Sequence, residues 1–232
     1  MAKDQRKRQQ IQQKNAAKRQ ARAIETKRKY IPSLFRSNAR TLVLEASAWP
    51  IHETLVSTSW RDTMGITQIV VARRNPGTGE VVTGAFLVDL GCLGVKSAFT
   101  SRFVGVREYE TNFRDGIMER QSLMSADINL AARILREAVA YAKNLGFEPD
   151  RDYNTARLIL GDADPDAVSE PIPTGGEDGK PFFMNGPHDN AERIINHLMR
   201  KLGPDGFTYI ASISPGATFL RGVDEYDDDD IV

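Results

Sequence analysis

The sequence predicts an α+β protein: a mostly antiparallel sheet with two or three packed helices, preceded by a basic N-terminal arm that is either helical or disordered. Three observations predict this: apolar, β-branched segments after residue 41, amphipathic helical segments later, and a very different composition in the first thirty residues. A chain of 232 residues with 41% hydrophobic and 27% charged residues is typical of one globular core. We therefore expect an arm over 1–30, a single globular domain over 31–222 and an acidic tail over 223–232.

The arm contains eleven basic side chains against Asp4 and Glu25, a net charge of +9, and it lacks glycine and proline. Its Gln, Lys, Arg and Ala residues are tolerated in helices, so a helix ending near Pro32 is expected. On a helical projection, one stripe within an arc of about 100° is basic, and no apolar stripe accompanies it. The stripe consists of Lys3, Lys7, Lys14, Lys18, Arg22 and Lys29. Such a helix is not held by core packing, so it is either solvated or folds against a charged partner.

β-Branched and apolar residues concentrate in the first half of the globular region. They predict strands in four segments, over residues 41–49, 52–60, 65–74 and 80–95. Asn75-Pro76-Gly77-Thr78-Gly79 separates the last two and predicts a hairpin, because glycine supplies the positive φ of a short reversal. A final strand over 207–213 is expected to complete the same sheet.

The clearest helical signal follows Asp127, which can cap a helix that Gly146 ends. Its apolar residues alternate between spacings of three and four, as expected for one face of a helix. They are Ile128, Ala131, Leu135, Ala138, Ala142 and Leu145.

Two shorter helices are predicted in the last third of the chain. One covers residues 153–160 and ends at Gly161; the other begins near Asp189 and stops at Gly203. The proline- and glycine-rich segment 162–180 between them is predicted to be a loop. A loop of this length is usually either a mobile functional lid or disordered.

The basic arm predicts a nucleic-acid partner, because phosphate contacts need only cations at reachable spacing and gain affinity from counterion release. RNA, the ribosome and DNA fit equally well. The expected phosphate-binding residues are Lys3, Lys7, Lys14, Lys18, Arg19, Arg22, Arg28 and Lys29. A solvated extension and an acidic protein partner remain alternatives. Membrane binding is disfavoured, because the arm lacks the apolar face that an interfacial helix buries.

The C-terminal tail carries six carboxylates, Asp224, Glu225, Asp227, Asp228, Asp229 and Asp230. The simplest interpretation is a solvated end. The alternative hypothesis is competition, in which these carboxylates mimic phosphates and occupy the arm when no polyanion is bound.

An enzyme is the alternative from a different class. His52, Asp89, Cys92 and Lys96 lie in the strand-rich region and are weak candidates for a site if they converge at one end of the sheet. His52 would then be a general base oriented by Asp89, and Cys92 a nucleophile. The competing interpretation of Cys92 is a small core residue. In the enzyme hypothesis the 162–180 loop closes as a lid over this site.

A protein-interaction module is the third hypothesis, with Trp49, Trp60 or a sheet edge as the contact surface. Two segments, FLVDLGCLGVKSAF and GKPFFMNGPHDN, are distinctive, but no function follows from them. Three histidines and one cysteine are too few and too scattered for a structural zinc site, and no cofactor is implied. One cysteine and no secretory signal predict a soluble, cytoplasmic protein; oligomeric state and RNA or DNA preference stay open.

Overall fold

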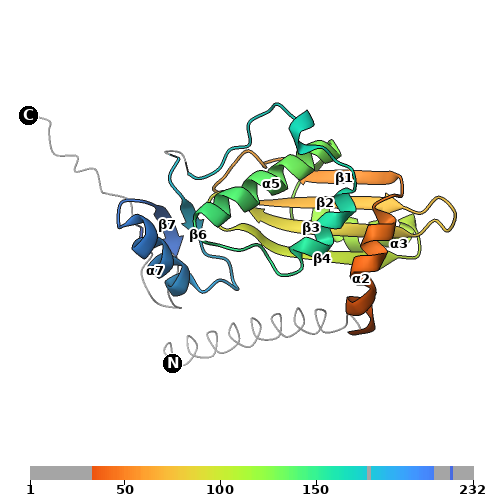
Figure 1. Ribbon diagram of the computed structural model, residues 1–232, viewed down its shortest axis with the longest axis horizontal. Helices are drawn as coiled ribbons and strands as arrows, with labels where there is room; N and C mark the ends of the chain where they lie inside the picture. Colours follow the sequence, from red (N-terminus) through yellow and green to blue (C-terminus); the bar gives the residue numbers. More distant parts are fainter. Residues whose placement is uncertain (1–32, 177–178, 212–219, 222–232) are drawn as a thin grey trace, which may run out of the picture. The chain divides into compact units, whose positions relative to one another are not determined.

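The structure is a computed structural model that describes residues 33–176, 179–211 and 220–221 (Figure 1). The predictions for the arm, for its phosphate-binding residues and for the acidic tail fall outside the described residues. The elements in chain order are α2 (Ser33–Ala46), β1 (Ile51–Ser57), β2 (Ile66–Arg74), β3 (Val81–Asp89), β4 (Gly94–Phe103), α3 (Val106–Tyr109), the π-helical η1 (Glu110–Arg114), α4 (Asp115–Met118), β5 (Leu123–Ser125), α5 (Ile128–Asn144), α6 (Tyr153–Ala156), the 3₁₀ turns η2 (Arg157–Leu160) and η3 (Pro165–Ala167), β6 (Phe182–Met184), α7 (Ala191–Leu202), β7 (Thr208–Ala211) and β8 (Leu220–Arg221).

The main sheet has five strands in the order β4-β3-β2-β1-β5, and each neighbouring pair is antiparallel. The predicted α+β class with an antiparallel sheet is confirmed. The predicted hairpin joins β2 to β3. Within it the Asn75 side chain accepts hydrogen bonds from the N–H groups of Gly77 and Thr78 at 2.9 and 3.1 Å, and Gly79 takes the positive φ of 79°.

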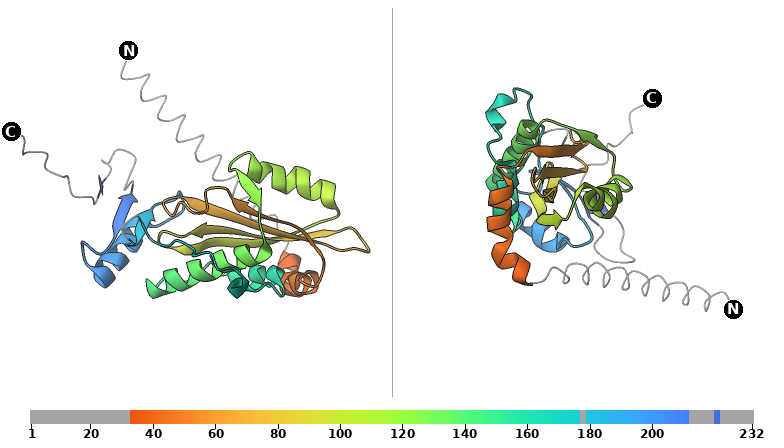
Figure 2. Two further views of the ribbon diagram at one scale, coloured as in Figure 1. Left: turned by 90° about the horizontal axis from the view of Figure 1, so that it is seen from above. Right: turned by 90° about the vertical axis from the view of Figure 1, so that its right-hand side faces the viewer.

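Helices cover the sheet on both faces (Figure 2). On one face, the continuous stretch α3–η1–α4 packs Phe113 and Ile117 against Leu55, Val70 and Ala85. On the other face, α5 and α6 lie against β3 and β4. Gly84 permits this contact, because a Cβ there would meet the Ile159 side chain at 2.6 Å and the Ala156 carbonyl oxygen at 3.0 Å. The core lies between these helices and the sheet.

Two helical regions differ from the sequence prediction. The predicted strand over 41–49 is wrong, because residues up to Ala46 belong to α2. Val43 and Ala46 are fully buried whereas Leu44 is 57% exposed, so burial follows a helical rather than an alternating period. Residues 106–118, a polar stretch without a predicted element, form α3–η1–α4 and bury Tyr109.

The helix signals further along the chain are confirmed. Asp127 caps α5 by accepting a hydrogen bond from Asn129 N at 2.7 Å, and Gly146 follows the helix with a φ of 87°. The start of α7 is displaced by one residue from the prediction. Asn190 is its cap and accepts a hydrogen bond from Arg193 N at 3.0 Å, which leaves Asp189 free for other contacts.

The C-terminal strand does not complete the main sheet. β7 pairs in parallel with β6 and antiparallel with β8 in a separate three-stranded sheet. The expectation that residues 207–213 join the first sheet is therefore wrong. A second hydrophobic cluster connects this region with the turn between β3 and β4. Its buried members are Cys92, Leu93, Leu145, Phe183, Leu198 and Phe207.

A buried arginine ties three segments together on β2. Arg73 is 5% exposed and donates hydrogen bonds to the carbonyl oxygens of Ile159 (2.7 Å), Trp49 (2.7 Å) and Leu160 (2.9 Å). Its guanidinium group therefore links the turn before β1 to the end of η2. Hydrogen bonds from a charged group are stronger than neutral ones, so Arg73 is a structural clamp.

Candidate functional site at the β3–β4 turn

The two distinctive sequence segments meet at the turn between β3 and β4. The Gly91 carbonyl oxygen accepts a hydrogen bond from Phe182 N at 2.9 Å, and the Leu90 carbonyl oxygen accepts one from Gly175 N at 3.0 Å. The 89–96 segment and the end of the 162–180 loop are therefore in contact. Their approach requires a glycine: a Cβ on Gly91 would meet the carbonyl oxygens of Thr63 at 2.7 Å and Phe182 at 2.8 Å.

Asp89 stabilises this turn from inside. Asp89 is only 4% exposed, and its Oδ1 accepts a hydrogen bond from Cys92 N at 2.9 Å. Burial raises the pKa of Asp89 to about 6, although the N–H groups of the turn and the positive charge of Lys96 favour the ionised form. Asp89 is therefore a buried carboxyl group whose pKa of about 6 lies well above the ordinary value of an aspartate.

Lys96 reaches the same region because of a β-bulge. Leu87 pairs with Ser97 and Val88 with Val95, so Lys96 is the extra residue in β4. Bulges re-aim side chains and recur beside functional sites. The Lys96 Nζ lies 2.5 Å from Asp189 Oδ2, and both side chains are largely buried, at 13% and 14% exposure.

Asp189 also closes the loop in which it lies. Its Oδ2 accepts a hydrogen bond from Gly186 N at 2.7 Å in addition to the ion pair with Lys96. Sequence reasoning interpreted Asp189 as a helix cap and missed this role. Its partner lies 93 residues away in the sequence, so no local pattern indicated it.

Cys92 is placed as a core residue. It is fully buried and belongs to the same cluster as Phe183 and Leu198. Burial, reinforced by the charge of Asp89, raises the pKa of the Cys92 thiol above its usual range. A thiol of this kind stays protonated at neutral pH, whereas a nucleophilic cysteine needs thiolate character.

His52 does not join Asp89, Cys92 and Lys96. Along β2, the partner of Ile51 is Arg73 and the partner of Asp89 is Ile66, seven residues away. At about 3.3 Å per residue, His52 and Asp89 lie roughly 20 Å apart. The proposed pairing of His52 with Asp89 and Cys92 is therefore absent from the structure.

A second polar cluster surrounds His52 at the opposite end of the sheet. A bulge places His52 as the extra residue of β1, with its ring centroid 5.9 Å from that of Tyr109. Burial raises the pKa of Tyr109, and the adjacent Glu53 adds to this effect. Arg114, at the end of η1, donates to Glu110 at 2.9 Å and lies 4.0 Å from Glu53. π-Helical turns recur at functional sites, but sequence inspection gave no signal for this one.

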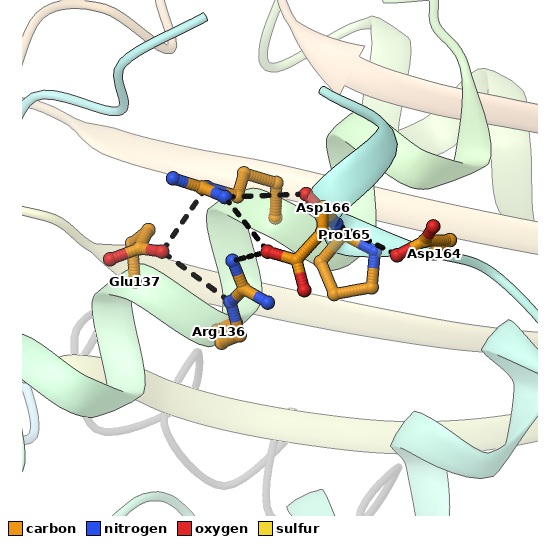
Figure 3. A network of polar contacts seen from close by, with 6 residues as sticks. Arg136, Glu137, Asp164, Pro165 and Asp166 are labelled. Atoms are coloured by element: carbon orange, nitrogen blue, oxygen red, sulfur yellow. Dashed lines mark hydrogen bonds and ion pairs between the residues drawn. The ribbon is translucent and has the colours of Figure 1, made fainter. Parts of the chain in front are cut away.

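The 162–180 loop is anchored to α5 at its start (Figure 3). Asp166 accepts a hydrogen bond from Arg136 at 2.8 Å, and Arg136 and Arg133 are both paired with Glu137. The first part of the loop is thus attached to the helix beside it. This anchoring does not favour the interpretation of the whole segment as a free lid.

Among residues 33–176, 179–211 and 220–221, no three His, Cys, Asp or Glu side chains are grouped so that they could hold a metal ion. No helix in the described part of the chain has the length and apolar character needed to cross a membrane. Comparisons of the chain with protein-family models, curated proteins and solved structures found no match.

Proposed function

We propose that this protein is a non-catalytic, cytoplasmic protein that associates with RNA or the ribosome through residues 1–30. The single observation that carries the proposal is the charge separation along the chain. The arm has eleven of the 31 basic residues and only two of the 31 acidic ones. The remaining chain then has 20 basic and 29 acidic residues, so attraction to phosphate is concentrated in the arm.

The globular region supplies a folded body for this arm rather than a second polyanion surface. Its contacts also bear on the other two hypotheses. The buried Cys92 is not suited to act as a nucleophile, and His52 lies at the other end of the sheet from Asp89. Trp60 is fully buried, so of the two tryptophans only the partly exposed Trp49 is available to a partner protein.

Salt-dependent binding tests the proposal. Intact protein and a protein that starts at Ile31 are titrated with labelled single-stranded RNA and duplex DNA at several salt concentrations. For about five phosphate contacts, log affinity falls against log salt with a slope near −3.5 for single strands and −4.5 for duplex. Most of this slope should vanish without the arm. If neither protein binds RNA or DNA at low salt, the proposal is wrong.

Matched variants separate charge from helix content. Replacing the basic stripe with glutamine should flatten the slope for single-stranded RNA by about 0.7 for each phosphate that the arm no longer neutralises; the stripe is Lys3, Lys7, Lys14, Lys18, Arg22 and Lys29. Replacing uncharged arm residues with alanine should leave the slope unchanged; suitable residues are Gln5, Gln9, Gln12 and Gln20.

Deleting residues 224–232 should tighten binding if the acidic tail competes for the arm, and equal affinities would exclude that competition.

A further inference from the structure

Hydrogen bonds and an ion pair connect the segments around Asp89. Asp89 accepts the Cys92 N–H and thereby shapes the turn, and the carbonyl oxygens of that turn bind Gly175 N and Phe182 N. Four residues after Phe182, Gly186 and Asp189 close a loop that Lys96 holds by an ion pair. The carboxyl of Asp89 therefore underlies the attachment of residues 182–190.

We propose that Asp89, Lys96 and Asp189 form a proton-responsive joint, in which protonation of Asp89 tightens the attachment of residues 182–190 to the β3–β4 turn and its ionisation loosens it. Two physical effects give this direction, and both follow from the contacts around the turn.

The first effect is desolvation. Asp89 is buried beneath a turn whose Gly91 is in close contact with the Phe182 backbone. Lifting residues 182–190 admits water to the carboxyl group, and water favours its ionised form. The attached state therefore holds the proton more tightly than the lifted state, so proton binding favours attachment.

The second effect is competition for Lys96. When Asp89 is ionised, Lys96 is attracted to two carboxylates, Asp89 in the sheet and Asp189 in the loop. When Asp89 is neutral, Asp189 is the remaining carboxylate partner. Of the groups in the described part of the chain, Lys96 is the charged side chain that acts on Asp89, and the neighbouring Cys92 thiol stays protonated throughout this pH range.

Amide hydrogen exchange on the full chain tests the joint. Exchange is measured at pH 5.0 and 7.5, corrected for the chemical effect of pH, and followed in peptides that cover residues 182–190. The pKa of Asp89 differs between the attached and lifted states by at most about two units, from about 6 to the ordinary 3.8, and only part of this difference is expressed between pH 5.0 and 7.5. The change in opening over this range is therefore limited to roughly tenfold. We expect a severalfold increase in opening at pH 7.5, up to about tenfold, with no change in the β2–β3 hairpin. Equal opening at both pH values would overturn the proposal.

Three variants assign the effect to its residues. Asp89→Asn keeps an acceptor oxygen but does not titrate, so opening should become independent of pH. Glu148→Gln removes an exposed carboxylate from the surface and should retain the wild-type response. Lys96→Met should increase opening at pH 5.0, because Asp189 loses its partner. A pH response that survives in Asp89→Asn would contradict the joint.

A direct titration keeps the test decisive if Asp89→Asn does not fold. The side-chain carboxyl carbon of Asp89 is followed by NMR in the intact protein across the same range. A midpoint near 6 is expected. In Lys96→Met the midpoint should rise, since the lysine charge favours ionisation of Asp89. A wild-type midpoint near 4, the ordinary range of an aspartate, would overturn the proposal.

Discussion

Arg73 and Asp89 are both buried charged residues of the same sheet, at 5% and 4% exposure, but they lie at opposite ends and are held differently. Arg73 donates to three carbonyl oxygens, and its group stays protonated even though burial lowers its pKa. Asp89 accepts from the turn, and burial brings its pKa to about 6. One end of the sheet thus has a permanent charge, and the other has a charge that pH can remove.

Replacement of Arg73 should produce the largest loss of stability. Arg73→Met leaves the carbonyl oxygens of Trp49, Ile159 and Leu160 without their charged donor. Each buried carbonyl oxygen that loses its hydrogen bond costs about 1 to 3 kcal/mol, so the three together are a large share of the stability of a domain. Urea unfolding at pH 7 measures the change.

The neighbouring arginine is the matched control for this experiment. Arg74 follows Arg73 in β2 but is exposed, and its replacement by methionine should change the unfolding free energy by less than about 0.5 kcal/mol. A similar loss in both variants would show that the three carbonyl contacts of Arg73 are not the source of its effect.

Asp89→Asn should raise the free energy of unfolding at neutral pH, whereas Arg73→Met should lower it. The folded-state pKa of about 6 exceeds the ordinary value of 3.8, so burial of Asp89 does not reduce the free energy of unfolding below about pH 4, where the carboxyl is protonated in both the folded and the unfolded protein. This stability is lost as pH rises through 6, because the folded protein then has to release the proton. Above that range the ionised group costs up to about 3 kcal/mol. Asp89→Asn should therefore be more stable than the wild type at pH 7.5. This advantage should grow by about 1.4 kcal/mol between pH 5.0 and 7.5, as measured by urea unfolding. A constant difference would contradict the raised pKa.

Gly91→Ala should disturb the turn that Asp89 supports. The new Cβ would meet two backbone carbonyl oxygens within 2.8 Å, and neither belongs to a flexible side chain. Overpacking of this kind costs about 1 to 3 kcal/mol. Gly116→Ala is the control, since it lies in α4 with nothing within 4 Å and should stabilise the helix by up to about 1 kcal/mol. Thermal unfolding of both variants checks the contrast.

The parts of the fold that local chemistry determines could be predicted from the sequence. Asp127 and Gly146 mark the ends of α5, and the Asn75–Gly79 segment marks the hairpin, because a cap or turn depends on a few adjacent residues. α2 was misassigned because a short apolar run such as Leu42-Val43-Leu44 suits a strand as well as a helix. The pairing of β7 with β6 depends on contacts distant in sequence.

The candidate site was predictable only in its composition. Asp89, Cys92 and Lys96 were singled out and do lie close together, but the contribution of Asp189 depends on a loop almost a hundred residues away. The bulge that directs Lys96 and the burial that raises the Asp89 pKa are consequences of packing. Neither leaves a pattern in the sequence, and for the same reason His52 was grouped with residues at the wrong end of the sheet.

The smallest effect is expected where charges are exposed. Arg136 lowers the pKa of Asp166, so the contribution of this pair is present above the ordinary pKa of an aspartate and is lost as pH falls through the lowered value. Exposed pairs are screened by water and salt, so Asp166→Asn should leave the urea midpoint at pH 7 nearly unchanged, and 1 M salt should remove the remaining difference. A loss as large as that of Arg73→Met would mean that the loop anchored on α5 supports the core, and burial would then no longer explain the difference between the strong and the weak charged contacts of this protein.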